Sequence, residues 1–171
     1  SDGSNRLIWR QNPRRLDAET LRDTVLAVSG KLNMERGGPG YRDFNYTEAY
    51  APIYEYVTPD KPELWRRSIY RFIVRTTPHQ FMTTLDCPDP ANLTPARAQT
   101  TTALQALTLS NNEFMLQQAH FLAERAKTPE RAFQLCFQRD AKPDELAAAK
   151  KLDLVSLCRM LLNANEFVYV D

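Results

Sequence analysis

Apolar side chains recur with the period of an amphipathic helix in several parts of the chain. The first such stretch follows Asp17 and places Leu21, Val25 and Val28 on one face. Aspartate is favoured just before a helix, and Gly30 lies where a glycine commonly ends one. The pattern therefore predicts a helix that starts after Asp17 and stops before Gly30.

The second half of the chain is also helical in pattern, and each stretch is preceded by a residue that typically starts a helix. The clearest start signal is Thr128 followed by Pro129, because proline fits the first helical position. The closing run Glu166–Asp171 is predicted to be extended. Helices are predicted over 96–110, from Asn111 or Asn112 through Ala126, from Pro129, from Lys142, and from Asp153 through Asn163.

Two stretches in the first half are predicted to be β structure. Ile53–Val57 suits a short strand, and Arg67–Val74 alternates polar and apolar residues. Arg67, Arg71 and Arg75 are also spaced by four, which would place them on one helical face. The aromatic and β-branched residues favour a strand. The connections are predicted to be a turn at Gly37–Gly40 and an irregular segment over Thr76–Pro95.

At 171 residues the chain is long enough to bury a core as one domain. We predict a mostly α, single-domain helical bundle over residues 1–171, with a small β element at about residues 53–74. A net charge of +1 argues against a nucleic-acid partner. No apolar run approaches the ~18 residues that span a bilayer, so no transmembrane segment is expected. Ser1–Ser4 is interpreted as a linker.

Few side chains suit a cofactor. Covalent haem attachment requires Cys-x-x-Cys-His, and Cys87, Cys136 and Cys158 are too far apart for it. His79 and His120 have no companion at the spacing of zinc ligands, and each is interpreted as a solvated or hydrogen-bonded side chain. We expect neither haem nor a transition metal in this chain.

The cysteines are not interpreted as a disulfide framework, because their number is odd. Cys136 and Cys158 lie among apolar residues at helical spacing and are predicted to be buried. Cys87 follows Asp86, whose carboxylate would raise the pKa of the thiol and make it less reactive. No catalytic residue is assigned.

The candidate binding residues are arginines and aspartates near the middle of the chain. The arginines of Arg66–Arg75 are expected to pair with Asp86, Asp89 or Glu63, or to bind an anionic glycan. Two carboxylates in one loop also raise the alternative of calcium. Thr100–Thr102 precedes an apolar helix and is expected to cap it. The predicted binding set is Arg66, Arg67, Arg71, Asp86, Asp89 and Arg97.

Four stretches of the chain resemble a known family. They are Asn12–Glu19 running into Leu26–Gly30, then Arg66–Tyr70, then Asp86–Asp89 with Thr101–Leu107, and Leu157–Asp171. Because these four stretches occur together and in this order, the chain resembles a known domain of unknown function. That domain lies at the C-terminal end of large planctomycete-type proteins that carry a cytochrome c-like domain. The family is longer than this chain between Leu146 and Leu157.

The resemblance implies a periplasmic or cell-envelope setting and a multidomain parent, of which this chain is a C-terminal fragment. It places haem only in an upstream domain, and it implies no activity. The favoured hypothesis is a non-catalytic structural or interaction module that docks against neighbouring domains of the parent. The alternative is part of an envelope enzyme or binding protein acting on polymeric carbohydrate, and a third is a calcium-stabilised adhesion module.

Two observations would test these hypotheses. Burial and mutual pairing of Arg66, Arg67, Asp86 and Asp89 would favour the structural module, whereas an open cleft would favour binding or catalysis. The apolar C-terminal segment is predicted to pack on the first helix or on Arg67–Val74, since an exposed apolar run promotes aggregation.

Overall fold

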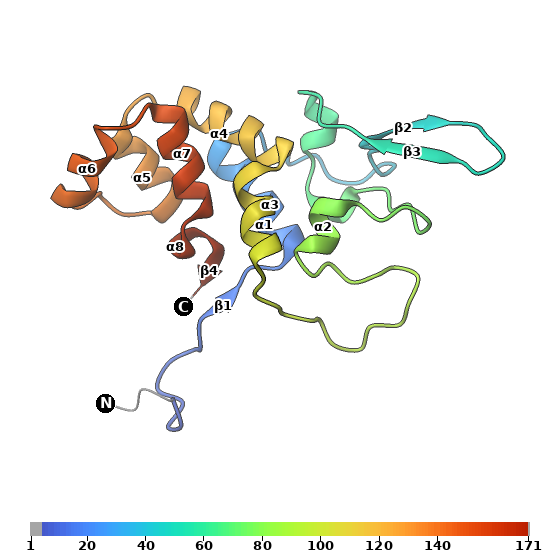
Figure 1. Ribbon diagram of the computed structural model, residues 1–171, viewed down its shortest axis with the longest axis horizontal. Helices are drawn as coiled ribbons and strands as arrows, with labels where there is room; N and C mark the ends of the chain where they lie inside the picture. Colours follow the sequence, from blue (N-terminus) through green and yellow to red (C-terminus); the bar gives the residue numbers. More distant parts are fainter. Residues whose placement is uncertain (1–4, 171) are drawn as a thin grey trace.

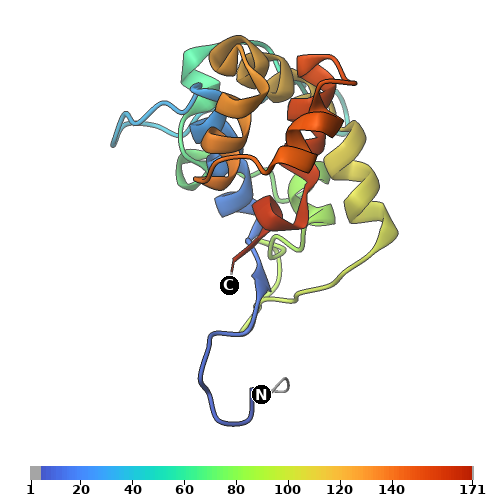
Figure 2. The ribbon, with the colours of Figure 1, turned by 90° about the vertical axis from the view of Figure 1, so that its left-hand side faces the viewer.

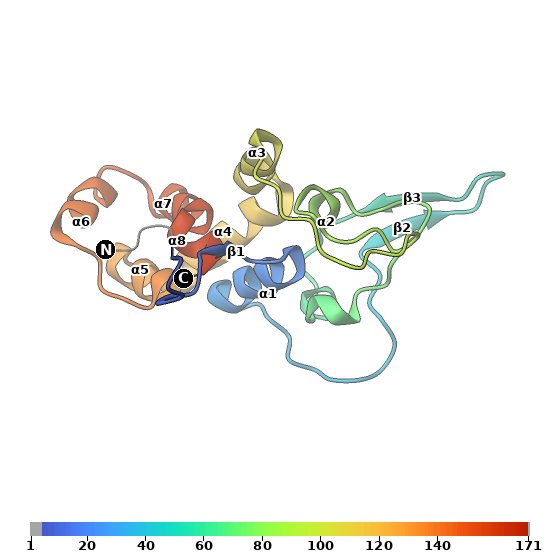
Figure 3. The same cartoon turned by 90° about the horizontal axis from the view of Figure 1, so that it is seen from below.

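The computed structural model describes residues 5–170, and the predicted linker Ser1–Ser4 lies outside them. Within this range the fold is mostly α, as predicted, with two small antiparallel sheets. Helices α5, α6 and α7 form one end and a β-hairpin the other, with α1 and α4 between them (Figures 1 and 3). The helices are α1 (Ala18–Ser29), α2 (Gln80–Thr84), α3 (Ala103–Asn111), α4 (Glu113–Ala126), α5 (Pro129–Phe137), α6 (Pro143–Ala149), α7 (Leu154–Asn163) and α8 (Asn165–Val168).

The predicted helix starts are confirmed where a side chain accepts a hydrogen bond from the first turn. Asn112, Thr128 and Asp153 each do so, at the starts of α4, α5 and α7. Asp17 occupies the corresponding position of α1 but makes no such bond. Gly30 ends α1 with a φ of 82°, which glycine adopts without strain.

The start of α3 differs from the prediction, since the helix begins at Ala103 and not at Ala96. Thr102 and Gln105 form a reciprocal cap, in which Gln105 N–H donates to Thr102 Oγ1 over 3.2 Å and Thr102 N–H to Gln105 Oε1 over 3.1 Å. Thr100 N–H donates to Asp86 instead of to a helical carbonyl. The preceding backbone is thereby kept out of the helix.

The predicted strand at Arg67–Val74 is wrong. That region contains one short 3-10 turn, η2 (Ser68–Tyr70), and another, η1 (Pro62–Trp65), precedes it. Side chains of α1 satisfy its backbone: Arg22 donates to the carbonyls of Leu64 and Arg66, and Asp23 accepts from Ser68 N–H. The segment also forms one isolated parallel bridge, in which Tyr41 N–H donates to Tyr70 O and Phe72 N–H donates to Tyr41 O, but no extended ladder.

The β structure lies earlier than predicted. Strands β2 (Phe44–Thr47) and β3 (Ile53–Tyr56) pair as a hairpin, with Phe44 opposite Tyr56. The hairpin projects from the helical body (Figure 1). Only its β3 strand was predicted, because the β2 sequence carries too few apolar residues to stand out.

Two short segments near the ends of the described chain pair to form the second sheet. Strand β1 (Arg14–Arg15) pairs with β4 (Tyr169–Val170), and residues 5–13 run away from the helices (Figure 2). The predicted extended tail is therefore partly wrong, since α8 precedes β4. The tail does pack within the chain, and its main contacts are with β1, α5 and α7.

The core lies where α4 packs against α1 on one side and α7 on the other. The predicted irregular segment Thr76–Pro95 contributes to it through α2, whose Phe81 and Met82 are buried. Cys136 and Cys158 are buried free thiols, as predicted. The largest fully buried side chains are Phe81, Leu21, Leu26, Leu85, Met115, Leu122, Leu162, Gln118, Val25 and Cys158.

Candidate functional site

Asp86 is a structural anchor between β1 and α3. Its Oδ2 accepts from Arg15 Nη2 over 2.7 Å and from Thr100 N–H over 2.8 Å, and Gln105 Nε2 lies 3.1 Å away. Burial alone would raise the pKa of Asp86, but the bonds from Thr100 and Arg15 outweigh it and hold the pKa below its usual value. These donors occupy the carboxylate that the calcium alternative would require.

Arg66 is buried but pairs with no carboxylate among the described residues. Its guanidinium donates to the carbonyl of Pro39 over 2.9 Å and to that of Gly37, and it stacks over the ring of Tyr70 at 4.2 Å. Arg66 therefore holds the predicted glycine turn in place.

Arg67, Arg97 and Asp89 lie at the surface and not in one cleft with Arg66. Arg97 donates to both oxygens of Glu19, over 2.8 and 2.9 Å, and Arg67 lines the same shallow recess. Asp89 accepts from Ala91 N–H over 2.9 Å, which is an ordinary turn contact. The candidate binding residues are thus dispersed.

The predicted pairing of the arginines in Arg66–Arg75 with Asp86, Asp89 or Glu63 is wrong, since no such pair forms within residues 5–170. Arg71 pairs instead with Asp43, whose Oδ2 accepts from Arg71 Nε over 2.9 Å. The pairs formed bring together residues that are remote in the sequence.

The Arg71–Asp43 pair lies in the wall of a cavity of about 350 Å³ at the base of the hairpin. His79 Nε2 is 3.7 Å from Asp43 Oδ2, and the His79 ring meets the Tyr56 ring edge-on at 4.5 Å. Arg22, from α1, lines the same cavity. Two guanidiniums, a carboxylate, an imidazole and a phenol therefore converge at one place.

Burial changes the pKa values of two ionisable side chains in and beside this cavity. Burial, and then the nearby Arg71 guanidinium, lower the pKa of His79 to about 4. Burial raises the pKa of Tyr41, next to the cluster, to about 12. His79 is therefore neutral at physiological pH and can both donate and accept a hydrogen bond.

Sequence analysis missed this site. His79 was interpreted as a solvated or hydrogen-bonded loop residue, whereas only 22% of its side chain is exposed. Asp43 drew no attention, because it follows a glycine turn far from both Arg71 and His79. One signal in the sequence is its excess of arginine, 16 residues against 6 lysines, but it does not say where the partners lie.

We expect stability to fall between pH 7 and pH 5 because of His79. In the unfolded chain a histidine has a pKa of about 6.5, so on acidification the unfolded state binds a proton before the folded state does. With a folded pKa of about 4, the free energy of unfolding should drop by about 2 kcal/mol at pH 5.

Urea unfolding at each pH measures this drop. The His79→Gln variant should lose most of the slope, whereas His120→Gln, at an exposed position, should keep it. An equal slope in wild type and His79→Gln would contradict the assignment.

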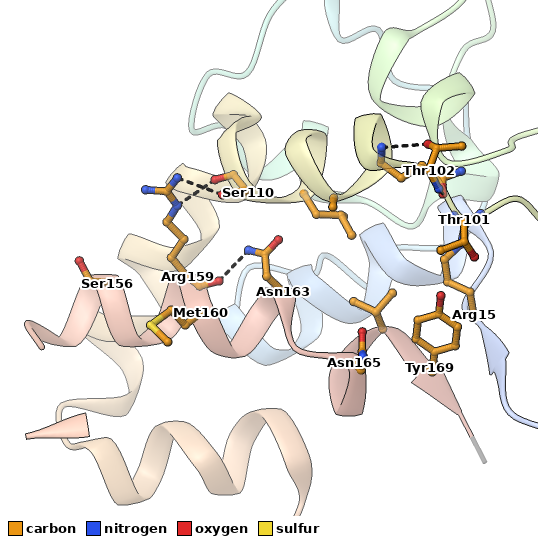
Figure 4. Close-up of a pocket in the computed structure, with 14 residues that line it drawn as sticks. Arg15, Thr101, Thr102, Ser110, Ser156, Arg159, Met160, Asn163, Asn165 and Tyr169 are labelled. Atoms are coloured by element: carbon orange, nitrogen blue, oxygen red, sulfur yellow. Dashed lines mark hydrogen bonds between the residues drawn. The ribbon is translucent and has the colours of Figure 1, made fainter. Parts of the chain in front are cut away.

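A second recess, of about 450 Å³, lies between α3 and α7 (Figure 4). Arg159 donates to Ser110 O over 2.8 Å, and Asn163 Nδ2 donates to Arg159 O over 2.7 Å. Arg15 and Tyr169 lie at the other end of the view. Among the described residues that line this groove none is acidic. Arg15 is paired with Asp86, so the positive charge that the groove presents is that of Arg159.

Neither described lining combines a serine or cysteine with a histidine or carboxylate: the α3–α7 groove has serines but no histidine or carboxylate, and the hairpin cavity has the reverse. The described lining of the hairpin cavity contains no serine or cysteine. Cys87 is not activated either: burial, and then Glu19 at 3.6 Å, raise the pKa of its thiol to about 11. The predicted rise is confirmed, but its causes are burial and Glu19 and not Asp86.

The described chain lacks two other functional features. Within residues 5–170 no three His, Cys, Asp or Glu side chains are grouped so as to hold a metal ion. None of the helices in that range has the length and apolar character to cross a bilayer.

Comparison with known proteins gives one match. The family model described as "PSD1: Protein of unknown function (DUF1553)" matches residues 1–152. The stretch Leu157–Asp171, which contributed to the resemblance, lies outside this match. No curated protein sequence and no solved structure matches the chain.

Proposed function

Since the chain belongs to the PSD1 family of proteins of unknown function, we propose that it is a non-catalytic interaction module of a multidomain envelope protein. Its α3–α7 groove receives an acidic, partly apolar segment from a neighbouring domain of the same polypeptide. The periplasmic or envelope setting and the upstream haem domain follow from the resemblance to planctomycete-type cytochrome-associated proteins.

The observation that carries this proposal is the charge of the groove. It is lined by Arg159, which forms no ion pair within residues 5–170, and by Arg15, whose charge Asp86 balances. The described lining contains no aspartate or glutamate. Between the two arginines lie amide and hydroxyl side chains, and apolar ones such as Leu109 and Met160. A segment with a carboxylate and an apolar side chain complements such a surface.

An exposed apolar position supports docking in this groove. Met160 lines the groove and is 58% exposed, although it lies on a helix whose other face is core. The neighbouring helix α3 contributes Ala106 and Leu109 to the same lining. Apolar side chains gathered on adjoining helices are typical of interaction surfaces.

A Met160→Asp variant tests the groove. It should bind the remaining domains of the parent polypeptide, expressed as a separate chain, about tenfold more weakly, because a new carboxylate repels the acidic segment. Calorimetric titration measures the affinity. The variant should melt at the wild-type temperature, since Met160 is 58% exposed.

The matched control is Met34→Asp, because Met34 is 56% exposed and does not line the groove. It should bind like the wild type. Equal weakening by both variants, or by neither, would overturn the assignment of the groove.

A second candidate function is part of an envelope enzyme or binding protein for polymeric carbohydrate. It is favoured by the hairpin cavity, where polar groups of both signs face one space. The groove proposal does not depend on it.

A further inference from the structure

Two buried polar atoms at the hairpin cavity have no hydrogen-bond partner within residues 5–170. They are Asp43 Oδ1 and His79 Nδ1, and both belong to residues that line the cavity. Asp43 as a whole is only 8% exposed. Buried polar groups are nearly always paired, and an unpaired one costs free energy, so each needs an explanation. A bound ligand that forms hydrogen bonds with both atoms is such an explanation.

The charges of the cavity indicate the class of that ligand. Arg71 is balanced by Asp43, and Arg22 lies 3.5 Å from Asp23. Two guanidiniums disfavour a cation. Two carboxylates, those of Asp43 and Glu113, line the cavity and disfavour a strong anion. A neutral ligand avoids both conflicts.

The hydrogen-bonding needs of the cavity narrow the class further. A carboxylate oxygen accepts only, whereas Arg71 has further N–H donors besides the one bound to Asp43. A hydroxyl group both donates and accepts, so neighbouring hydroxyls can serve Asp43 and Arg71 together. The cavity thus suits a ligand with adjacent hydroxyl groups.

Part of the remaining lining is apolar. Trp65, Phe81 and Phe114 form part of the wall, and the volume lies within the ~300–1,000 Å³ of small-molecule pockets. A sugar ring has a hydroxyl-bearing edge and C–H faces, which match the two kinds of wall. We propose that this cavity binds one unit of a neutral saccharide through a pair of adjacent hydroxyls, with Asp43, Arg71 and His79 as its polar contacts.

This site is separate from the docking groove, since the two described linings share no residue. Failure of either proposal leaves the other standing. The saccharide site also gives the carbohydrate alternative a defined location.

Tryptophan fluorescence provides the test. The chain has two tryptophans, so Trp9→Phe leaves Trp65, in the cavity wall, as the sole reporter. The Trp9→Phe chain is titrated with methyl glucoside, methyl mannoside, methyl galactoside and cellobiose, and calorimetry repeats each titration. A saturable change in fluorescence and heat with at least one of these neutral probes is expected.

Three variants in the Trp9→Phe background complete the test. Asp43→Asn should weaken binding about tenfold or more, the usual scale for a lost hydrogen bond to a charged group. Gln80→Phe keeps the Arg71–Asp43 pair and adds bulk at an exposed residue of the lining, so it should abolish binding even if Asp43→Asn misfolds. Asp89→Asn, in an exposed turn, should bind normally.

The proposal is overturned if none of the four neutral probes binds, or if Gln80→Phe binds as well as its parent. It is also overturned if sulfate or glucuronate binds more tightly than every neutral probe. A crystal structure soaked with these probes that shows only water between Asp43 and His79 would have the same consequence.

Discussion

An Asp86→Asn variant is expected to lose about 3–5 kcal/mol of unfolding free energy, because it strips a buried guanidinium of its partner. The Arg15 side chain is 8% exposed and donates to Asp86 Oδ2 over 2.7 Å. Asparagine keeps the shape of aspartate and tolerates the positive φ of 63° at this position, so the change isolates the charge. Urea unfolding followed by circular dichroism measures the loss.

The comparison variant is Asp89→Asn, which makes the same change in the same loop. Asp89 is exposed and serves a local turn, so we expect a change within about 0.5 kcal/mol. An unfolding midpoint that is unchanged in Asp86→Asn, or equally lowered in both variants, would show that Asp86 does not balance a buried charge.

The helix starts were predictable because a cap is a local event. Asn112 accepts from Phe114 N–H, and Thr128 accepts from Arg131 N–H, so each signal lies within a few residues of its partner. The order and approximate extent of the second-half helices followed from these signals. They carry no information on which helices pack together.

The pairings of the charged residues were not predictable, because they connect distant segments. Arg67–Val74 has the composition of a strand, and only the folded structure shows that Arg22 and Asp23 of α1 satisfy the backbone around it. The candidate cavity depends on the same kind of contact, between Asp43 and Arg71. The spacing of residues in the sequence predicts neither the contacts of Arg22 and Asp23 nor the Asp43–Arg71 pair.

The excess of arginine also has a structural explanation. The chain has 16 arginines and 6 lysines. Arg125 donates to the carbonyls of Ala27 and Val28 at the end of α1, and Arg159 donates to that of Ser110 at the end of α3. Carbonyls in the last turn of a helix lack their usual i+4 N–H donor, and a planar guanidinium can bind two of them at once. The arginines therefore bind backbone carbonyls as well as forming ion pairs.

Removing the residues from Asn165 onward is expected to unfold or precipitate most of the protein. The deletion takes Phe167 and Val168 out of the core, where they are 5% and 4% exposed. Their burial is worth about 3–6 kcal/mol together, against a typical domain stability of about 5–15 kcal/mol. It also removes β4, the partner of β1, so that the Leu16 N–H loses its acceptor, Val168 O at 2.9 Å.

Two point variants separate packing from surface effects in this segment. Phe167→Ala should cost about 3–5 kcal/mol, since it leaves a cavity in the core. Glu166→Gln breaks a partly exposed contact with Arg139, which also binds Glu145, and should cost less than about 1 kcal/mol. Solubility and the melting temperature are measured for all three proteins. A deleted chain that stays soluble and melts like the wild type would show that the segment is not part of the core, and a large loss in Glu166→Gln alone would assign its role to the ion pair.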